Sequence, residues 1–405
     1  MYKLPSKSSH KQWIILGSEL SPFTLKVLNY FSFLEIPHQF YYSQGSFFEN
    51  IKIQIKKMAL VYGKVSLTWP KMGEKDEFPL VPFVFGPNGE ALYDSTAIAD
   101  WLENFSGLFL SKTLFPAKGK NAKLDFIQHL IEEFFDDWGL YIVHHNRWKV
   151  ACLDNNAGER LGRELKSVIG PFGFVVDSYF SSRQTRRLPY LFSVAPEGFQ
   201  IEGAKLQPPS HEDFPPTHEL LEKSFGRILK ILEKIFTSRP FLFGECYTLA
   251  DSSIYGQLGM NLSDVSAANW IAKDAPHTYE WLQHLANLDF TYHQESVEPQ
   301  YFNDLAPLLE EISRVYLPLM DQNEKAYSKF YESGQRLFNE KAFWKNEAIY
   351  EGSIDGIPFK SVTKSFQVTT WQVIKEKYQA LSAEDRDALA AVMLNAKLLM
   401  SPIVS

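Results

Sequence analysis

The change of hydrophobic period near residue 120 constrains the fold of this chain more than any other feature. Before that point, short apolar runs typical of strands alternate with segments of helical spacing. After about Lys123, apolar residues recur every three or four positions over long segments, as in amphipathic helices. The pattern predicts an α+β domain followed by an all-helical domain, and a length of 405 residues leaves room for a third region.

The first hundred residues predict the order β-α-β-(α)-β-β-α, which is the order of a thioredoxin-like domain. Ser21 and Pro22 mark the start of the first helix, because Ser caps helices and Pro suits the first helical position. Pro87-Asn88-Gly89 is a turn sequence and predicts a β-hairpin. We expect strands at Trp13–Gly17, His38–Tyr42, Val81–Gly86 and Ala91–Tyr93, and helices at Pro22–Leu34, Ile51–Val61 and Ser95–Phe105.

The second half of the chain predicts helices. Thr248 and Asp251 have the spacing of a capping box, in which each side chain satisfies a free backbone N–H of the other. His218–Thr237 has strong helical spacing. The long helix expected from about Lys123 carries on one face Leu124, Ile127, Ile131, Phe134, Trp138, Tyr141, His145 and Trp148.

A third, mixed α/β region follows residue 296. Ile312–Leu337 and Ala383–Met400 have helical spacing. Between them, Ile354-Asp355-Gly356-Ile357 lies among β-forming residues and predicts a second hairpin. We therefore expect helices and one hairpin in this region.

Composition excludes several classes of protein. A net charge of −7 argues against a nucleic-acid binder, which needs a basic surface. Two unrelated cysteines, no apolar leader at the start and no run of about 20 apolar residues predict a cytoplasmic protein without membrane spans. The dense basic cluster Arg183, Arg186 and Arg187 either faces solvent at a helix end or attracts an anionic ligand.

Three short motifs occur in an order that can build a site for a thiol peptide. They are Ser21-Pro22-Phe23 after an apolar run, Val81-Pro82-Phe83 before another, and Asp94-Ser95 at the start of a helix. Each motif by itself has a structural explanation, as a helix cap or as the beginning of a strand. Their combination, ahead of an all-helical region, favours a common function.

Together these motifs resemble the amino-terminal half of the glutathione transferase superfamily, in its serine-type classes. The stretch Arg239-Pro240-Phe241-Leu242-Phe243-Gly244, followed by Thr248-Leu249-Ala250-Asp251, is similar to a characteristic stretch of the family's helical domain. The resemblance covers about residues 13–290. It implies a thioredoxin-like glutathione-binding domain at 11–107, an all-helical substrate domain at 119–295, and a carboxy-terminal extension at 296–405 that has no counterpart.

The resemblance also implies roles for single residues. Ser21 would activate the glutathione thiol. The residues expected to bind glutathione are Phe23, Val81, Pro82 in the cis form, Asp94 and Ser95. The residues expected to line a hydrophobic substrate pocket are Phe134, Trp138, Tyr141, His145 and Trp148, with the alternative that these five simply build the core.

Physical chemistry is consistent with this role of Ser21. A free thiol has a pKa of about 8.5, so little thiolate exists near neutrality. A Ser hydroxyl can donate a hydrogen bond to thiolate, and a helix start adds about 0.3–1 kcal/mol of favourable electrostatic energy. A Cys at this position would favour disulfide exchange, whereas Ser favours attack on an electrophilic carbon. Ser18 is an alternative hydroxyl, although it precedes the expected helix.

Two features depart from the family pattern. Thr68 stands where the family commonly has a lysine that binds the glycine carboxylate of glutathione, with Lys64 and Lys71 nearby. The segment 43–80 is also longer than usual.

We expect no metal. Glu133, Asp137 and His144 share one helix face, as do His277, Glu280 and His284, but carboxylate-bridged sites need ligands from several facing helices.

Two functional hypotheses remain open at this point. The first is a glutathione transferase-like enzyme of detoxification. It would use glutathione as co-substrate against a small hydrophobic electrophile, and would form a homodimer, as the family does. The second is a non-catalytic protein of the same fold that acts as an interaction module.

Overall fold

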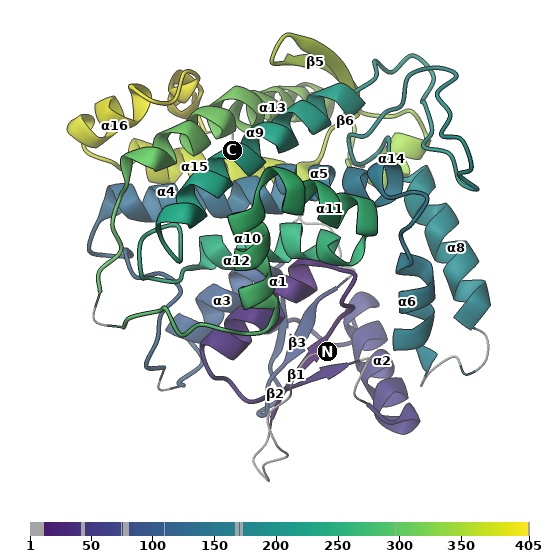
Figure 1. The fold of residues 1–405 in the computed structure, drawn as a ribbon, viewed down its shortest axis with the longest axis horizontal. Coiled ribbons are helices and arrows are strands. Elements are labelled where there is room, and N and C mark those ends of the chain that lie inside the picture. The colour runs from purple at the N-terminus through teal and green to yellow at the C-terminus, as the bar shows by residue number, and fades with distance from the viewer. Residues whose placement is uncertain are drawn as a thin grey trace.

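A computed structural model describes residues 12–41, 45–73, 75, 81–108, 110–166, 170, 173–295 and 297–403. A small sheet lies at one end of the molecule, and helices form layers above it (Figure 1). Among the described residues, no helix combines the length and hydropathy that a membrane span needs.

The amino-terminal sheet has four strands in the order β2-β1-β3-β4. β1 pairs with β2 in parallel, whereas β1–β3 and β3–β4 are antiparallel. This arrangement, with three helices between and after the strands, confirms the predicted thioredoxin-like domain. Its elements are β1 (Trp13–Leu16), α1 (Pro22–Phe33), β2 (His38–Tyr41), α2 (Phe47–Val61), β3 (Phe83–Phe85), β4 (Ala91–Tyr93) and α3 (Ser95–Asn104).

The alternation of side chains along the strands places helices on both faces of this sheet. Ile15, Val84 and Leu92 point to the face that α1 and α3 cover, and they belong to the main core. Leu16 and Phe83 point to the opposite face, where a smaller core includes Ile53 of α2. Successive residues of a strand point to opposite faces, so burial on both faces makes these strands almost continuously apolar.

The helix expected from about Lys123 is present but contains two π-helical turns. It runs through α4 (Ala122–Phe134), the π turn η1 (Phe135–Gly139), α5 (Leu140–His145) and the π turn η2 (Asn146–Val150). A π turn holds more residues than an α turn, so each one rotates the following side chains away from the face predicted from α-helical spacing.

The remaining helices of the middle region follow the predicted pattern. Thr248 and Asp251 form the expected capping box at the start of α10, and Asp251 also accepts a hydrogen bond from the Leu242 N–H at 2.9 Å. The helices are α6 (Ala157–Glu164), α8 (Gly173–Arg186), α9 (His218–Ser238), α10 (Leu249–Met260), α11 (Val265–Asp274) and α12 (Pro276–Ala286), with the 3₁₀ turn η4 (Asn261–Ser263).

The carboxy-terminal region contains the predicted hairpin. β5 and β6 are antiparallel and meet at Ile354 and Ile357, and the turn residues Asp355 and Gly356 have φ values of 52° and 75°. Asp-Gly suits such a turn because both residues tolerate positive φ. The helix expected over Ala383–Met400 instead ends at Ala390. The elements are η5 (Asn303–Leu305), α13 (Ala306–Glu332), α14 (Glu340–Trp344), β5 (Ile349–Ile354), β6 (Ile357–Val362), α15 (Ser365–Gln379), α16 (Ala383–Ala390) and η6 (Ala396–Met400).

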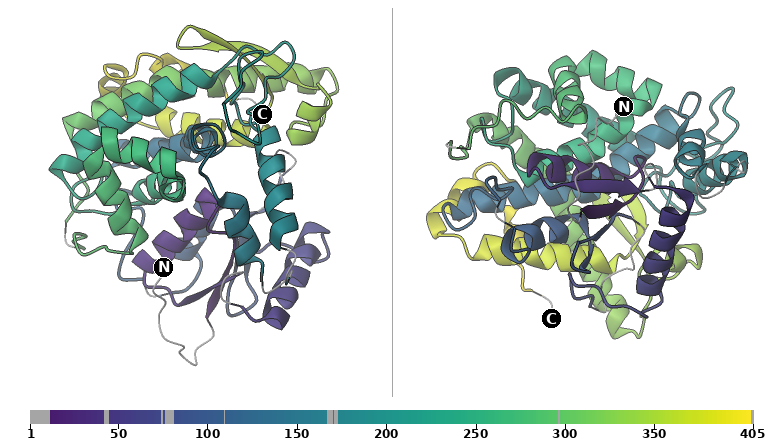
Figure 2. Two further views of the ribbon diagram at one scale, coloured as in Figure 1. Left: turned by 45° about the vertical axis from the view of Figure 1, so that its right-hand side comes forward. Right: turned by 90° about the horizontal axis from the view of Figure 1, so that it is seen from below.

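This region shares its core with the middle helices. Figure 2 shows its helices, in yellow, beside α4. The rings of Tyr316 in α13 and Phe134 in α4 lie 5.8 Å apart, and those of Tyr378 in α15 and Phe126 lie 5.4 Å apart. Residues 297–403 therefore cover one side of α4 with apolar side chains.

Candidate functional site

The register of the sheet brings the three predicted motifs together at one end of its strands. Leu16 pairs with Phe83, and Phe83 pairs with Tyr93. The segment that follows β1, the segment that precedes β3 and the segment that follows β4 therefore lie side by side at that end. They carry Ser21, the Val81–Pro82 pair and Asp94-Ser95, respectively. The Val81–Pro82 peptide bond is cis, as the resemblance implied.

Ser21 caps α1 with a hydroxyl that is only weakly engaged. Its Oγ accepts a hydrogen bond from the Thr24 N–H at 3.4 Å, the long end of the range. Among the residues that the structure describes, no acceptor takes the hydroxyl proton of Ser21. The side chain is half-buried, as is that of Phe23 in the first turn of the helix. Ser21 therefore has a proton to donate at a helix start.

Ser18, the alternative hydroxyl, is already committed to a carboxyl group. Its Oγ donates to Glu164 Oε2 at 2.6 Å, and the Glu19 N–H donates to Glu164 Oε1 at 2.7 Å. Burial raises the pKa of Glu164, at the end of α6, to about 7. Because Ser18 is buried and held by Glu164, Ser21 is the freer of the two hydroxyls.

A buried arginine fixes the loop that leads into α1. The Arg147 guanidinium donates to the Leu20 carbonyl at 3.1 Å, to the Met260 carbonyl at 2.7 Å and to Asp264 at 2.8 Å. The π turn η2 and helices α6 and α10 thus position the residue that precedes Ser21. Sequence reasoning missed Arg147 and Glu164, because neither belongs to a local motif.

Asp94 and Ser95 stand at the start of α3. Asp94 has a φ of 67°, and its carboxylate accepts from the Thr96 N–H at 3.1 Å and the Ala97 N–H at 2.9 Å. Ser95 is buried, and its carbonyl accepts from the Tyr30 hydroxyl at 3.0 Å. Asp94 itself is exposed, so part of the carboxylate can meet an ammonium group.

Thr68, at the position of the family's lysine, pairs with β4. Its N–H donates to the Ala91 carbonyl at 2.7 Å, and its Oγ1 accepts from the Ala91 N–H at 2.9 Å. The Lys64 and Lys71 side chains nearby are exposed. Of the segment 43–80, residues 43, 44, 74 and 76–80 lie outside the described residues.

The five residues expected to line a substrate pocket pack into the protein interior. Trp138 donates its indole N–H to Ser224 at 2.9 Å, and His145 Nδ1 lies 2.7 Å from the Ser193 hydroxyl. Burial lowers the pKa of His145. The whole set, with at most 4 % of any hydrophobic member exposed, is Phe134, Trp138, Tyr141, His145 and Trp148.

Of these five, Trp148 lies nearest to the start of α1. It belongs to a small cluster with Leu20, the residue before Ser21, and with Leu161 and Phe180 of α6 and α8. The Trp148 and Phe180 rings lie 5.8 Å apart, edge to face. Tyr141, by contrast, stacks on Phe192 and accepts from the Lys364 ammonium. The structure thus separates members of a set that the sequence placed on one face.

A buried ionic cluster lies between α1 and α4. The Lys26 ammonium pairs with Glu132 at 2.7 Å and Asp136 at 2.6 Å, and it donates to Thr96 at 3.1 Å. Burial by itself lowers the pKa of Lys26, but the two carboxylates outweigh burial and hold the pKa above its ordinary value. A third carboxyl, Asp137, accepts from the Tyr316 hydroxyl at 2.8 Å, and burial raises its pKa to about 6.

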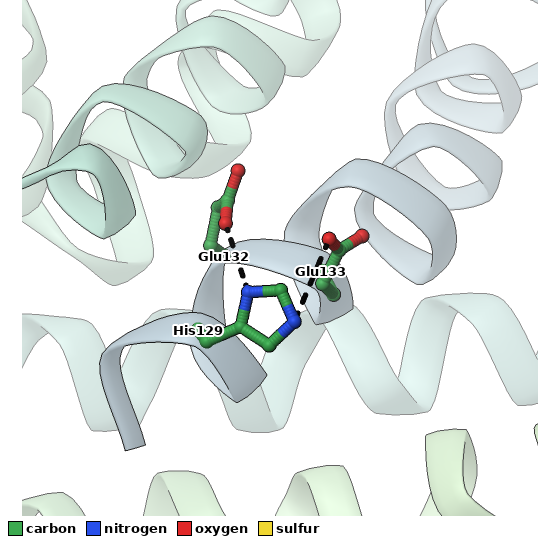
Figure 3. A group of neighbouring side chains, drawn as sticks. All are labelled: His129, Glu132 and Glu133. Carbon is green, nitrogen blue, oxygen red and sulfur yellow. Dashed lines mark ion pairs between the residues drawn. The ribbon is translucent and has the colours of Figure 1, made fainter. Parts of the chain in front are cut away.

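Three side chains of α4 could contribute ligands to a cation (Figure 3). His129 Nδ1 lies 3.5 Å from Glu132 Oε2, and His129 Nε2 lies 3.9 Å from Glu133 Oε1. Their donor atoms lie within 4.8 Å of one another. Lys26 already pairs with Glu132, so the contacts of His129 with the two carboxylates explain the group without a cation. Sequence reasoning missed the spacing His-x-x-Glu-Glu.

The two metal sets that the sequence suggested do not assemble. His144 lies 3.3 Å from Gln184, and burial lowers its pKa to about 3. His277 pairs with Glu233 at 2.6 Å, and His284 pairs with Asp289 at 3.0 Å.

Comparisons with known proteins concern mainly the middle region. Residues 208–289 match the family model of the glutathione S-transferase C-terminal domain. No curated protein matches the chain.

Two solved structures show weak similarity. One is a glutathione S-transferase from Pseudomonas fluorescens, with 14 % identity, a TM-score of 0.33, and coverage of 67 % of this chain and 93 % of that one. The other is glutathione transferase F7 from Populus trichocarpa, with 14 % identity, a TM-score of 0.36, and coverage of 69 % and 97 %. Similarity at this level does not bear on activity or substrate.

The matched segment contains α9 to α12 and the stretch from Arg239 to Asp251 that the sequence singled out. It follows an amino-terminal domain with the strand order β2-β1-β3-β4 and a cis proline before β3. Residues 208–289 are therefore similar to the C-terminal domain of glutathione S-transferases.

Proposed function

We propose that the protein is a glutathione transferase-like enzyme in which Ser21 activates the thiol of glutathione. The observation that supports this most is that Ser21, cis Val81–Pro82 and Asp94-Ser95 come together at one end of the strands of the sheet. The peptide groups of Val81, beside Pro82, would hold the cysteinyl part of glutathione. Asp94 and the start of α3 would hold the γ-glutamyl ammonium and carboxylate.

Thiol activation then requires only groups of this chain. The Ser21 hydroxyl donates to the sulfur, and the start of α1 adds partial positive charge. One pKa unit corresponds to about 1.36 kcal/mol, so the two effects together lower the thiol pKa by roughly one to two units. Thiolate becomes the main species near neutral pH and attacks an electrophilic carbon of the second substrate.

We place the electrophile next to the apolar cluster of Leu20, Trp148, Leu161 and Phe180. This cluster adjoins the loop that carries Ser21, whereas Phe134, Trp138, Tyr141 and His145 pack further into the interior. An apolar substrate would bind there in preference to a charged one. The compartment that fits is the reducing cytoplasm, because Cys152 and Cys246 are free thiols.

The test is retention on immobilised glutathione combined with conjugation of a generic aryl halide. Ser21→Ala should lower kcat/KM for conjugation by about a hundredfold or more, the loss expected when one donor to a developing anion is removed. Ser46→Ala is the matched control, because Ser46 also caps a helix, accepting from the Glu49 N–H at 3.4 Å, but lies at α2.

Both variants lose a helix cap, which costs about 0.5–2 kcal/mol of stability. Because Ser46 caps α2 and not α1, conjugation by the Ser46→Ala variant should remain near the wild-type level. Equal losses in the two variants would mean that Ser21 is only a cap.

The second candidate is a non-catalytic interaction module of the same fold. The packing of most of the expected pocket residues into the interior favours it, because those side chains are unavailable to a substrate. Absence of both glutathione retention and conjugation, with a protein partner recovered through residues 297–403, would support the module over the enzyme.

A further inference from the structure

A basic hollow lies between α8 and α14, and none of the residues that line it belongs to the proposed thiol site. It has a volume of about 330 Å³ and is lined by Tyr179, Arg183, Arg186, Arg187, Glu340 and Trp344. We call it the α8–α14 hollow. The arginines are the cluster that the sequence singled out, and the thiol chemistry does not use them.

Charge in this hollow is unbalanced. Arg183 and Arg187 share one carboxylate, Glu340, at 3.5 Å and 3.0 Å. Arg186 donates its Nε–H to the Ser182 carbonyl at 3.4 Å, and no carboxylate among the described residues pairs with it. Three guanidinium groups thus face one carboxylate, which leaves an excess of two positive charges. Guanidinium groups match phosphate oxygens with paired N–H donors.

Two aromatic side chains at the hollow are uncovered. Tyr179 is 66 % exposed and Trp344 is 50 % exposed. The Trp344 indole N–H donates a long hydrogen bond to Glu340 Oε1 at 3.4 Å, and its ring lies 5.0 Å from that of Phe343. An exposed ring beside cations suits a planar aromatic ligand that carries negative charge.

We propose that the α8–α14 hollow binds a small aromatic phosphate. Arg183 and Arg186 would contact the phosphate, and Tyr179 and Trp344 would contact the ring. Glu340 is a positioning residue, since it orients Arg183, Arg187 and Trp344 at once. The volume lies in the range of small-molecule sites, which begins at about 300 Å³. A nucleotide and a simple aryl phosphate share this chemistry.

The experiment is calorimetric titration of the full chain with phenyl phosphate, adenosine monophosphate and inorganic phosphate, each at low salt. We expect phenyl phosphate, the nucleotide or both to bind about tenfold tighter than inorganic phosphate, because only they contact the rings. Tighter binding of the nucleotide than of phenyl phosphate would identify nucleotides as the source. Failure of all three probes to bind at millimolar concentration would overturn the proposal.

Variants test the two halves of the site separately. Arg183→Gln/Arg186→Gln should weaken binding of the aromatic phosphates by about tenfold or more, since charge-assisted hydrogen bonds are lost. Arg187 is left intact because it packs over the Tyr190 ring at 5.6 Å. The matched control is Arg163→Gln/Lys230→Gln, which removes the same charge from other exposed positions. Equal weakening in both double variants would reduce the site to non-specific charge and contradict the proposal.

Tyr179→Ala tests the aromatic half. It should remove most of the preference for phenyl phosphate over inorganic phosphate, whereas Tyr292→Ala, at a comparably exposed ring elsewhere, should not. An unchanged preference in Tyr179→Ala and in Trp344→Ala would exclude the aromatic contact.

Discussion

At the scale of single residues, two neighbouring serines have different roles because their surroundings differ. Ser18 donates to Glu164 at 2.6 Å, whereas Ser21 only accepts a long hydrogen bond at a helix start. Both are small hydroxyls three positions apart, and the sequence favoured Ser21 through the Ser21-Pro22-Phe23 motif and its position at the expected helix start. The contact that distinguishes them comes from a residue 146 positions away from Ser18.

Ser21→Cys should change the reaction rather than remove it. A thiol at the start of α1 would be partly ionised. It would attack the glutathione sulfur of a mixed-disulfide substrate, break that disulfide, form a new disulfide with glutathione and release the substrate as its thiol, so this exchange should rise from background. Mass spectrometry of the glutathione adduct measures it. Ser18→Cys is the control, and an adduct of equal extent there would argue against a special position of residue 21.

Glu164 should make stability depend on pH. Its pKa is raised from 4.5 to about 7 in the folded protein. Below about pH 4.5 the carboxyl is protonated in both states and adds nothing to the pH dependence. Between about pH 4.5 and 7 the unfolded chain loses this proton while the folded protein keeps it. The free energy of unfolding should fall over that window, by up to about 1.4 kcal/mol per pH unit from this group, and level off above it.

Glu164→Gln should flatten this slope, measured by urea denaturation at several pH values. The groups that face the carboxyl are Ser18, Glu19 and Arg160. Exposed Glu159 on the same helix is the control position. A wild-type slope retained in Glu164→Gln would place the titrating group elsewhere.

Lys26→Met should destabilise the fold by about 3–5 kcal/mol, since it leaves two buried carboxylates without their cation. The loss is measured as the change in free energy of unfolding. Lys26→Met/Glu132→Gln should recover part of it, because one of the two charges disappears. A double variant less stable than the single one would contradict this explanation.

At the scale of elements, the two structural domains meet where α10 crosses α1. A Cβ added at Gly256 would lie 2.7 Å from the Pro22 carbonyl, so the glycine permits the close approach. Ser252 strengthens the crossing by donating to the Lys26 carbonyl at 2.9 Å. The crossing places α1, and with it Ser21, against the helical region.

Gly256→Ala should therefore destabilise the protein and displace the start of α1, with a loss of conjugation activity. Gly226→Ala in α9 is the matched control, because no atom lies within 4 Å of its added Cβ. That variant should gain roughly 0.5–1 kcal/mol from the higher helix propensity of Ala. Thermal denaturation compares the two, and a stabilised Gly256→Ala variant would refute the close-approach argument.

At the scale of the whole molecule, residues 297–403 complete a core that begins in α4. Tyr316, Trp371 and Tyr378 are buried against the middle region, and Lys375 forms a buried ion pair with Glu324 at 2.6 Å. Without residues 297–403, that side of α4 would be uncovered. The extension therefore acts as structure, and any partner it binds would meet its outer surface.

A chain ending at residue 295 should fail to reach a well-packed state. Exposure of the apolar side of α4 predicts binding of a hydrophobic dye and loss of near-ultraviolet circular dichroism. If loss of the interface with α4 causes this defect, co-expression of residues 297–405 as a separate chain should restore part of the near-ultraviolet signal. A soluble 1–295 fragment with native near-ultraviolet signal would show instead that residues 1–295 fold without the extension.

The sequence by itself determined the local elements. Caps, turn residues and hydrophobic period predicted α1, the β3–β4 hairpin, the capping box at Thr248 and the Asp355-Gly356 turn, because these depend on residues close together in the chain. The stretch from Arg239 to Asp251, which the sequence singled out, lies inside the segment that matches the glutathione S-transferase C-terminal domain.

Only the tertiary structure decided what surrounds the candidate site. Trp148 packs beside Leu20, whereas Trp138 and Tyr141 both contact Phe192 in the interior. Arg147 and Glu164 reach the segment before α1 from elements far away in the sequence. Burial and long-range hydrogen bonds determine whether the hydroxyls of Ser18 and Ser21 are engaged and what pKa Glu164 has. The spacing of neighbouring residues predicts neither property.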